Sequence, residues 1–142
     1  MKKMLLFTIA VSIFSLSING QRLNESQVPG PAKTAFEKNY PGIRGSWDKE
    51  DANYEVNFRK DGKPMSAVID KNGTIVETEA DIPAAQLPKN VRDYVKQHYS
   101  AAGISEAAKV VKASGEINFE AEVNHKDLIF DANGKFIKEE KD

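Results

Sequence analysis

Asp70-Lys71-Asn72-Gly73 is a turn sequence that returns near the other end of the chain as Asp131-Ala132-Asn133-Gly134. Each copy lies between two short apolar runs. Asn-Gly in that setting is a strong hairpin signal, because the tight turn needs positive φ at both central residues. We therefore expect a β-hairpin at each copy, with Asn and Gly both at positive φ.

The residues upstream of each turn also repeat. Val28-Pro29 and Leu87-Pro88 each open a helical pattern that ends in a tyrosine. The apolar positions keep a constant offset of 59 between the copies: Val28, Ala32, Phe36 and Tyr40, then Leu87, Val91, Val95 and Tyr99. Spacings of three and four predict one apolar stripe on each helix. A repeat of this kind indicates an architecture built twice.

Strand patterns follow each helix. Tyr54, Val56 and Phe58 alternate with polar residues in the first copy, and residues 117–123 alternate in the same way in the second. Period two predicts strands with one apolar side and one side in water. A less regular strand pattern precedes each of these, at residues 44–49 and 106–113.

These patterns together predict an α+β fold. We expect a tandem repeat of one helix plus about four antiparallel strands, joined edge to edge in one curved sheet with both helices on one face. Residues 21–27 are polar and predict a loose lead-in. The domain would then span 28–142, with repeat one at 28–80 and repeat two at 81–142. That length suffices to bury a core.

The first twenty residues have the pattern of a secretory signal peptide. Lys2 and Lys3 precede a mostly apolar stretch at residues 4–18, and Asn19-Gly20 leads into polar sequence. The stretch is too short for a confident membrane span. We expect cleavage after Gly20, with a cut after Ser17 and an uncleaved anchor as alternatives. The predicted mature protein is exported, to the periplasm or beyond, and has no membrane span.

Charge and cysteine content exclude several classes of function. Without Lys2 and Lys3, 18 basic residues face 21 acidic ones, a net charge of −3. The charges are interspersed with no basic block, so nucleic acid is not an expected partner. The chain has no Cys. That excludes disulfides, thiol catalysis, thiolate metal sites and lipid attachment at a cysteine.

The ordered set of motifs resembles the PepSY-like family described as "putative beta-lactamase-inhibitor-like". It runs through Val28-Pro29, Ala35-Phe36, Tyr40-Pro41, Trp47, Tyr54-Glu55-Val56, Asp70-Lys71-Asn72-Gly73, Ile82-Pro83, Leu87-Pro88, Tyr94, Tyr99 and Phe130 to Phe136. The resemblance covers the whole mature chain. It implies a small exported bacterial protein with a fold similar to beta-lactamase inhibitory protein, which presents a concave sheet face to a partner. Related PepSY domains are proposed to restrain secreted peptidases. The chain lacks the cysteines of the secreted inhibitor, so no inhibitory contact is carried over.

The polar side of the two alternating strands is the candidate partner-binding surface. It comprises Glu55, Asn57, Arg59, Asn118, Glu120 and Glu122. An acidic sheet face would recruit a basic partner and steer its approach. The competing interpretation is an ordinary solvated sheet face.

Other residues predict no catalytic, cofactor or metal site. His98 and His125 share no metal-ligand spacing. The two Asp-X-Asn-Gly segments fit a calcium loop poorly, because Val68 and Ile129 stand where its first carboxylate belongs. Trp47 is expected in the core rather than at a binding hot spot.

The sequence therefore predicts a non-enzymatic binding module, an inhibitor or modulator of an envelope protein or peptidase with a protein or peptide partner. The alternative is a carrier of a small ligand or peptide, with a pocket between helices and sheet lined by residues such as Phe36, Tyr94 or Phe119. A hydrolase is a third candidate, which would need a clustered carboxylate or His site that the linear sequence hides.

Overall fold

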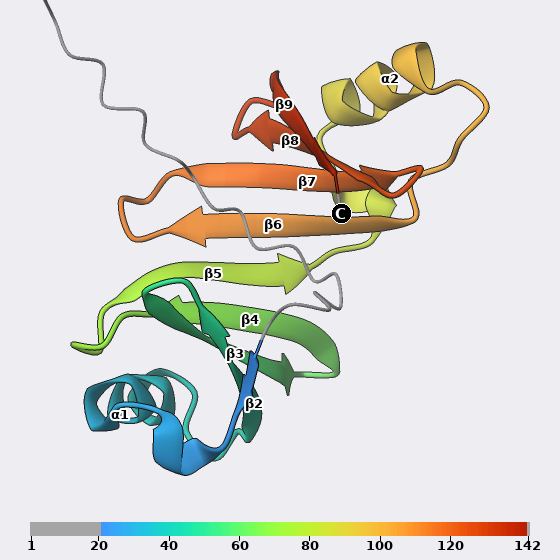
Figure 1. The fold of residues 1–142 in the computed structure, drawn as a ribbon. Helices are drawn as coiled ribbons and strands as arrows, with labels where there is room; N and C mark the ends of the chain where they lie inside the picture. The colour runs from blue at the N-terminus through green and yellow to red at the C-terminus, as the bar shows by residue number, and fades with distance from the viewer. Residues whose placement is uncertain (1–20, 142) are drawn as a thin grey trace, which may run out of the picture.

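The computed structural model describes residues 21–141, and the expected signal peptide at residues 1–20 lies outside them. The described residues form nine β-strands and two α-helices, with α1 between β1 and β2 and α2 between β5 and β6 (Figure 1). The first half contains β1 (Gln21–Leu23), α1 (Gly30–Asn39), β2 (Gly45–Glu50), β3 (Asn53–Lys60), β4 (Lys63–Ile69) and β5 (Ile75–Asp81). The second contains α2 (Lys89–His98), β6 (Glu106–Lys112), β7 (Ile117–Val123), β8 (Lys126–Asp131) and β9 (Phe136–Lys141). Single 3₁₀ turns precede the helices at Glu25–Gln27 and Ala84–Gln86.

All nine strands form one antiparallel sheet in sequence order, β1 to β9. The two halves join where β5 pairs with β6, from Glu77 opposite Lys112 to Asp81 opposite Ala108. The predicted α+β class and the edge-to-edge junction are confirmed. Because β5 and β6 pair directly, neither half leaves an open sheet edge at the junction.

Each helix covers its own half of the sheet with its predicted apolar stripe. The first buried cluster contains Val28, Ala32, Phe36, Trp47, Val56, Phe58, Ala67 and Ile69. The second contains Leu87, Val91, Val95, Ala107, Ala121, Val123, Leu128 and Phe130. Trp47 is 6% exposed and meets the Phe36 ring edge-on at 5.8 Å, which confirms its core position.

The strand register places both clusters on one face of the sheet. Ala67 of the first cluster lies opposite Thr78, and Thr78 lies opposite Val111. Val111 and Ala107 are four residues apart on β6, so their side chains share a face. Ala107 belongs to the second cluster, and both helices therefore pack against the same side.

The two Asp-X-Asn-Gly turns close hairpins as predicted, but the expected φ values are wrong in part. Only the glycines have positive φ, +88° at Gly73 and +76° at Gly134. Asp70 explains the difference: one carboxylate oxygen accepts the backbone N–H of Asn72 and of Thr74, both at 2.9 Å. That Asx arrangement, followed by a left-handed glycine and a register shift in β4, replaces the two-residue turn.

Each of these glycines also lies against the start of its own helix. A Cβ at Gly73 would come within 2.6 Å of the backbone oxygen of Pro31, and one at Gly134 would meet the Asn90 side chain. Asn90 Nδ2 in turn donates to the backbone oxygen of Asn133. The repeated turn thus fastens a hairpin to a helix in each half, which explains why the turn and the helix start repeat together.

Replacing Gly73 with Ala should destabilise the protein by about 3 kcal/mol. About 1–2 kcal/mol comes from the left-handed backbone and the rest from the collision with Pro31. Gly62→Ala is the matched control, because Gly62 has φ of +78° and no atom near the added Cβ. Urea unfolding of the two variants measures the difference. Equal losses in both would contradict the proposed contact with the helix.

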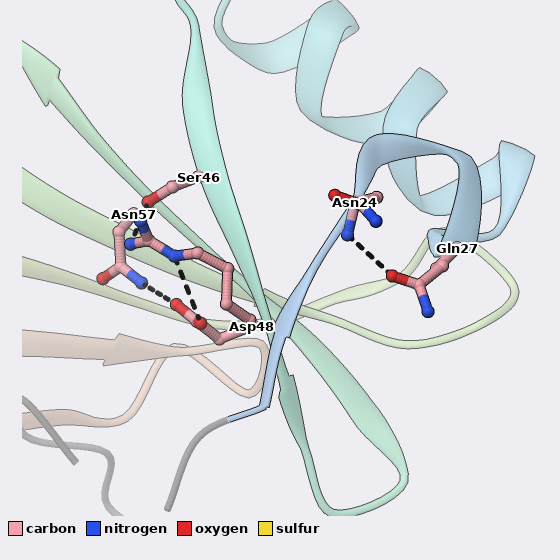
Figure 2. A network of polar contacts seen from close by, with 6 residues as sticks. Asn24, Gln27, Ser46, Asp48 and Asn57 are labelled. Atoms are coloured by element: carbon pink, nitrogen blue, oxygen red, sulfur yellow. Dashed lines mark hydrogen bonds and ion pairs between the residues drawn. The ribbon is translucent and has the colours of Figure 1, made fainter. Parts of the chain in front are cut away.

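The predicted loose lead-in is more ordered than expected. Gln21–Leu23 pairs with β2 as strand β1, and Leu23 packs against the first cluster. The backbone N–H of Asn24 donates to Gln27 Oε1 at 2.8 Å and closes the following 3₁₀ turn (Figure 2). Leu23, the apolar residue of this strand, therefore helps to hold the segment against the sheet. Among the described residues, no helix has the length and apolar character needed to cross a membrane.

Candidate functional site

The six candidate residues lie on the sheet face opposite the helices. Glu55, Asn57 and Arg59 alternate with Val56 and Phe58, which face the first cluster. On β7 the other three alternate with Phe119 and Ala121 of the second cluster. We call this side the polar face and define it by these charged and polar members: Arg22, Ser46, Asp48, Glu50, Glu55, Asn57, Arg59, Ser66, Glu77, Glu79, Asp81, Glu106, Lys112, Asn118, Glu120, Glu122, Asp127, Lys138 and Glu140.

Two glutamates from different halves line the same hollow at the centre of this face. Glu79 lies opposite Val110 on β6, and Glu120 lies opposite Ala108 on the other side of the same strand. Because Val110 and Ala108 are neighbours on one face of β6, Glu79 and Glu120 lie on either side of this strand, close enough for the charge of Glu120 to raise the pKa of Glu79. The junction between the two halves therefore creates the centre of the site.

This centre is buried, contrary to the expectation of a side in water. Glu79 is 2% exposed, Glu120 3% and Asp127 2%. Val110 and Ile129 lie between them on the same face and are also buried. A face that carries apolar residues among its acids packs its side chains together, so the polar face is solvated only at its margins.

The two central glutamates have no hydrogen-bond partner. Within the described part of the chain, both carboxyl oxygens of Glu79 and both of Glu120 are buried without a donor. Asn118 Nδ2 donates to the backbone oxygen of Phe130 at 3.4 Å, while its own Oδ1 has no partner among the same residues. Unsatisfied buried acceptors cost free energy, so their retention on one face points to a function.

Burial raises the pKa of these carboxyl groups. Loss of water raises the pKa of Glu120 to about 9, with Asp127 and Glu77 adding to the rise. Burial, followed by the charge of Glu120, raises the pKa of Glu79 well above its usual value. Glu77 and Glu50 rise to about 7, again chiefly through burial. Glu79 and Glu120 at the centre of the face are thus held protonated near neutral pH.

A small hollow opens beside the central pair. It is lined by Glu79, Asp81, Glu106, Ala107, Ala108, Glu120, Glu122 and Asp127. Ala108 lies between Asp81 and Glu120 in the register, and its methyl group leaves the space that a larger side chain would fill. The volume is about 10 Å³, room for one water-sized group.

The margin of the polar face near β1 is a polar network (Figure 2). Asn57 Nδ2 donates to Asp48 Oδ2 at 3.1 Å, and Arg22 Nε lies 3.9 Å from Asp48 Oδ1. Arg22 also donates to Ser46 Oγ at 3.5 Å. The segment predicted as a loose lead-in therefore supplies a basic group to the edge of this face.

The remaining predicted residues are held at the margins. Arg59 is exposed and donates to the backbone oxygen of Gly62 at 3.0 Å. Glu122 Oε1 accepts the Ser105 hydroxyl at 3.0 Å. The structure brings Glu120 and Glu122 to the hollow but leaves Arg59 outside it.

Sequence reasoning missed the contribution of β5. Glu77, Glu79 and Asp81 alternate with Thr78 and Ala80, the same period-two signal that identified the candidates on β3 and β7. That pattern could have shown that the three acids share a face. Their approach to Glu120 depends on the pairing of β5 with β6, which no local pattern predicts.

The histidines form no site with the acids. His98 is exposed and stacks on Tyr94 with ring centroids 4.1 Å apart, and His125 is exposed in the turn between β7 and β8. Residues 21–141 contain no group of three or more His, Asp or Glu side chains arranged to hold a metal ion.

Of the three aromatic residues proposed to line a carrier pocket, Phe36 and Tyr94 pack against other rings, and Phe119 packs against the second cluster. Phe36 contacts Tyr40 at 5.5 Å and Phe58 at 5.1 Å between centroids. Tyr94 stacks on Phe136 at 4.7 Å. Rings therefore occupy the space between helix and sheet where a carried ligand would have to lie.

The chain matches one known family along most of its length. Residues 16–77 and 52–138 match the family described as "Putative beta-lactamase-inhibitor-like, PepSY-like". The two overlapping matches agree with a pattern present twice. A comparison with curated proteins gives no match.

Several solved structures share the fold at low sequence identity. A protein from Bacteroides eggerthii described as a "putative periplasmic" protein superposes with a TM-score of 0.73 at 16% identity, over 80% of this chain and 88% of that one. A DUF2874 family protein from Bacteroides uniformis gives 0.72 at 18%, over 80% and 88%. A BLIP-like protein from Bacteroides fragilis gives 0.61 at 19%, over 80% and 85%.

Proposed function

The chain belongs to the PepSY-like family described as "putative beta-lactamase-inhibitor-like", and from that membership we propose that it is an exported, non-enzymatic module that binds a protein or peptide. Its partner is a basic protein of the cell envelope, such as a peptidase that it inhibits or modulates. The polar face is the binding surface. The description of one relative as periplasmic and of another as BLIP-like supports both the location and the mode of action.

The observation that carries this proposal is the pair of buried glutamates without partners. Both helices pack on the opposite side of the sheet, so neither covers this face. Acids outnumber bases on it, with Arg22, Arg59, Lys112 and Lys138 as its basic members. A basic partner would supply both the charge and the donors that Glu79 and Glu120 lack.

The clustered carboxylates also meet the requirement stated for a hydrolase, but the small volume of the hollow beside them favours a binding role. A general acid and base must have a substrate bond between them. The hollow beside Glu79 and Glu120 has a volume of only about 10 Å³. A side-chain tip fits there, whereas a sugar or peptide bond with its flanking groups does not.

The test begins with capture from the envelope fraction of the protein's own cells. Captured proteins are identified by mass spectrometry, and the best candidate is purified and titrated by calorimetry. Asp81→Asn with Glu122→Gln should weaken binding by about tenfold, because both acids border the hollow. The affinity should also fall as salt is added.

A matched double variant controls for net charge. Glu37→Gln with Asp93→Asn removes two acids from the helices α1 and α2 instead. Its affinity should stay within about twofold of the original protein, since distant exposed charges contribute little. Equal losses in the two double variants, or binding that ignores salt, would contradict the assignment of the polar face.

A further inference from the structure

We propose that the hollow around Ala108 holds one primary ammonium group, the tip of a lysine side chain of the partner, between the carboxyl groups of Glu79 and Glu120. The inference rests on the proposed function and adds the chemistry of one contact to it. It assigns these two glutamates as the specificity-determining residues of the polar face.

The size of the hollow selects the kind of cation. Its volume of about 10 Å³ accommodates one water-sized group. An ammonium is a compact point charge of that size, whereas a guanidinium is a planar fork of three nitrogens. Lysine therefore fits where arginine does not. The small side chain of Ala108 is the reason that there is space at all.

The hydrogen-bonding needs of the two groups also match. An ammonium has three N–H donors and no acceptor. Glu79 and Glu120 present four buried oxygens that lack donors among residues 21–141. Glu79 is 2% exposed and Glu120 3%, so both are aimed into the hollow rather than at bulk water. Filling it would satisfy acceptors that are otherwise costly to bury.

Binding must release a proton, because an ammonium pairs with an ionised carboxylate. The ammonium keeps its own proton, and the carboxyl group of Glu120 or Glu79 gives its proton to the buffer. Burial raises the pKa of both groups, which keeps them protonated while the hollow is empty. The charged groups that act on the pair from every neighbouring strand are Glu55, Glu77, Asp81, Asp127, Lys138 and Glu140.

The experiment is calorimetry of the purified protein with n-butylammonium as the probe. Titrations near neutral pH in two buffers of different ionisation enthalpy count the protons released. We expect saturable binding at one site, release of about one proton, and affinity about tenfold weaker for n-butylguanidinium. Calcium chloride serves as a third probe, since a calcium site would prefer that ion.

Two variants test the site in different ways. Glu120→Gln removes one of the two ionisable groups, so it should weaken butylammonium binding by about tenfold and leave Glu79 as the one member of the pair that can release a proton. Ala108→Val keeps every charge and fills the hollow, so it should weaken binding to a similar degree. Glu37→Gln, exposed on α1, should bind as the original protein does. Circular dichroism confirms that each variant is folded.

Three results would overturn the inference: no saturable binding of butylammonium by the original protein, equal or tighter binding of butylguanidinium or calcium, or undiminished binding in a folded Ala108→Val. Each is separate from the proposed function. If butylammonium fails while the envelope partner still binds through Asp81 and Glu122, the hollow is not an ammonium site and the polar face remains the interface. If butylammonium binds and no partner is found, the hollow is an ammonium site and the proposed function fails.

Discussion

Raising the pH from about 5 to about 9 should lower the free energy of unfolding by several kcal/mol. Glu120 keeps its proton in the folded protein up to a pKa of about 9, whereas its ordinary value is 4.5. Between these values the unfolded chain binds fewer protons than the folded one, so stability falls as the pH rises. Each such group costs up to about 1.4 kcal/mol per pH unit across the window.

The sign of this effect is opposite to that of a salt-bridged acid. A carboxylate stabilised by a cation has a lowered pKa, and its contribution is lost when the pH falls. Glu79 and Glu120 have raised pKa values, so their contribution is complete below about 4.5 and is lost as the pH climbs through the folded-state value. The protein should therefore be more stable in mild acid than in mild base.

Urea unfolding at a series of pH values measures this slope, and Glu120→Gln should flatten it. The amide stays neutral at every pH, so only the remaining acids contribute. Glu37→Gln makes the same chemical change at an exposed position of α1 and shows what the loss of a charge does away from the polar face. If Glu120→Gln leaves the slope unaltered, then Glu120 does not have a raised pKa in the folded protein.

Truncating Phe130 to Ala should cost about 3–5 kcal/mol, the range for a large aromatic side chain in a closed core. Phe130 is 0% exposed. Its ring meets Tyr94 edge-on at 5.4 Å and Phe136 at 5.8 Å between centroids. Removing it leaves a cavity under α2 that these partly buried rings can fill only by leaving their own contacts. That loss is a large part of a typical domain's total stability.

Ile137→Ala is the matched control on the neighbouring strand. Ile137 is 48% exposed, so its truncation should change the stability by no more than about 0.5 kcal/mol. Because β5 and β6 tie the halves into one sheet, Phe130→Ala should also lower the unfolding midpoint of the first half, as read from Trp47 fluorescence. An unchanged Trp47 transition would contradict a single cooperative unit.

Most of the fold could be predicted because its signals are local. The stripe from Val28 to Tyr40 and its copy from Leu87 to Tyr99 mark the two helices, and the structure buries the central residues of both. The Asp-X-Asn-Gly segments mark the hairpins. The expected positive φ of the asparagine in each turn is wrong. In the first turn the carboxylate of Asp70 accepts the backbone N–H groups of the turn, a contact that the Asn-Gly pair does not reveal.

The site could be predicted only in part because its centre is non-local. Alternation correctly grouped Glu55 with Asn57, and Glu120 with Glu122. It could not show that Glu79 and Glu120 line the same hollow, because that arrangement depends on the pairing of β5 with β6. Alternation also could not show that this face is dry at its centre. Val110 and Ile129, which read as ordinary strand residues, exclude water there.

We expect the polar face to hold two buried glutamates that stay protonated until a cation arrives. Carbon-13 NMR of the side-chain carboxyl groups, followed through a pH titration of the protein alone, tests it most directly. We predict a midpoint of about 9 for Glu120 and one well above the ordinary 4.5 for Glu79. Midpoints near 4.5 for both would contradict the account, because they would mean that water already solvates the pair.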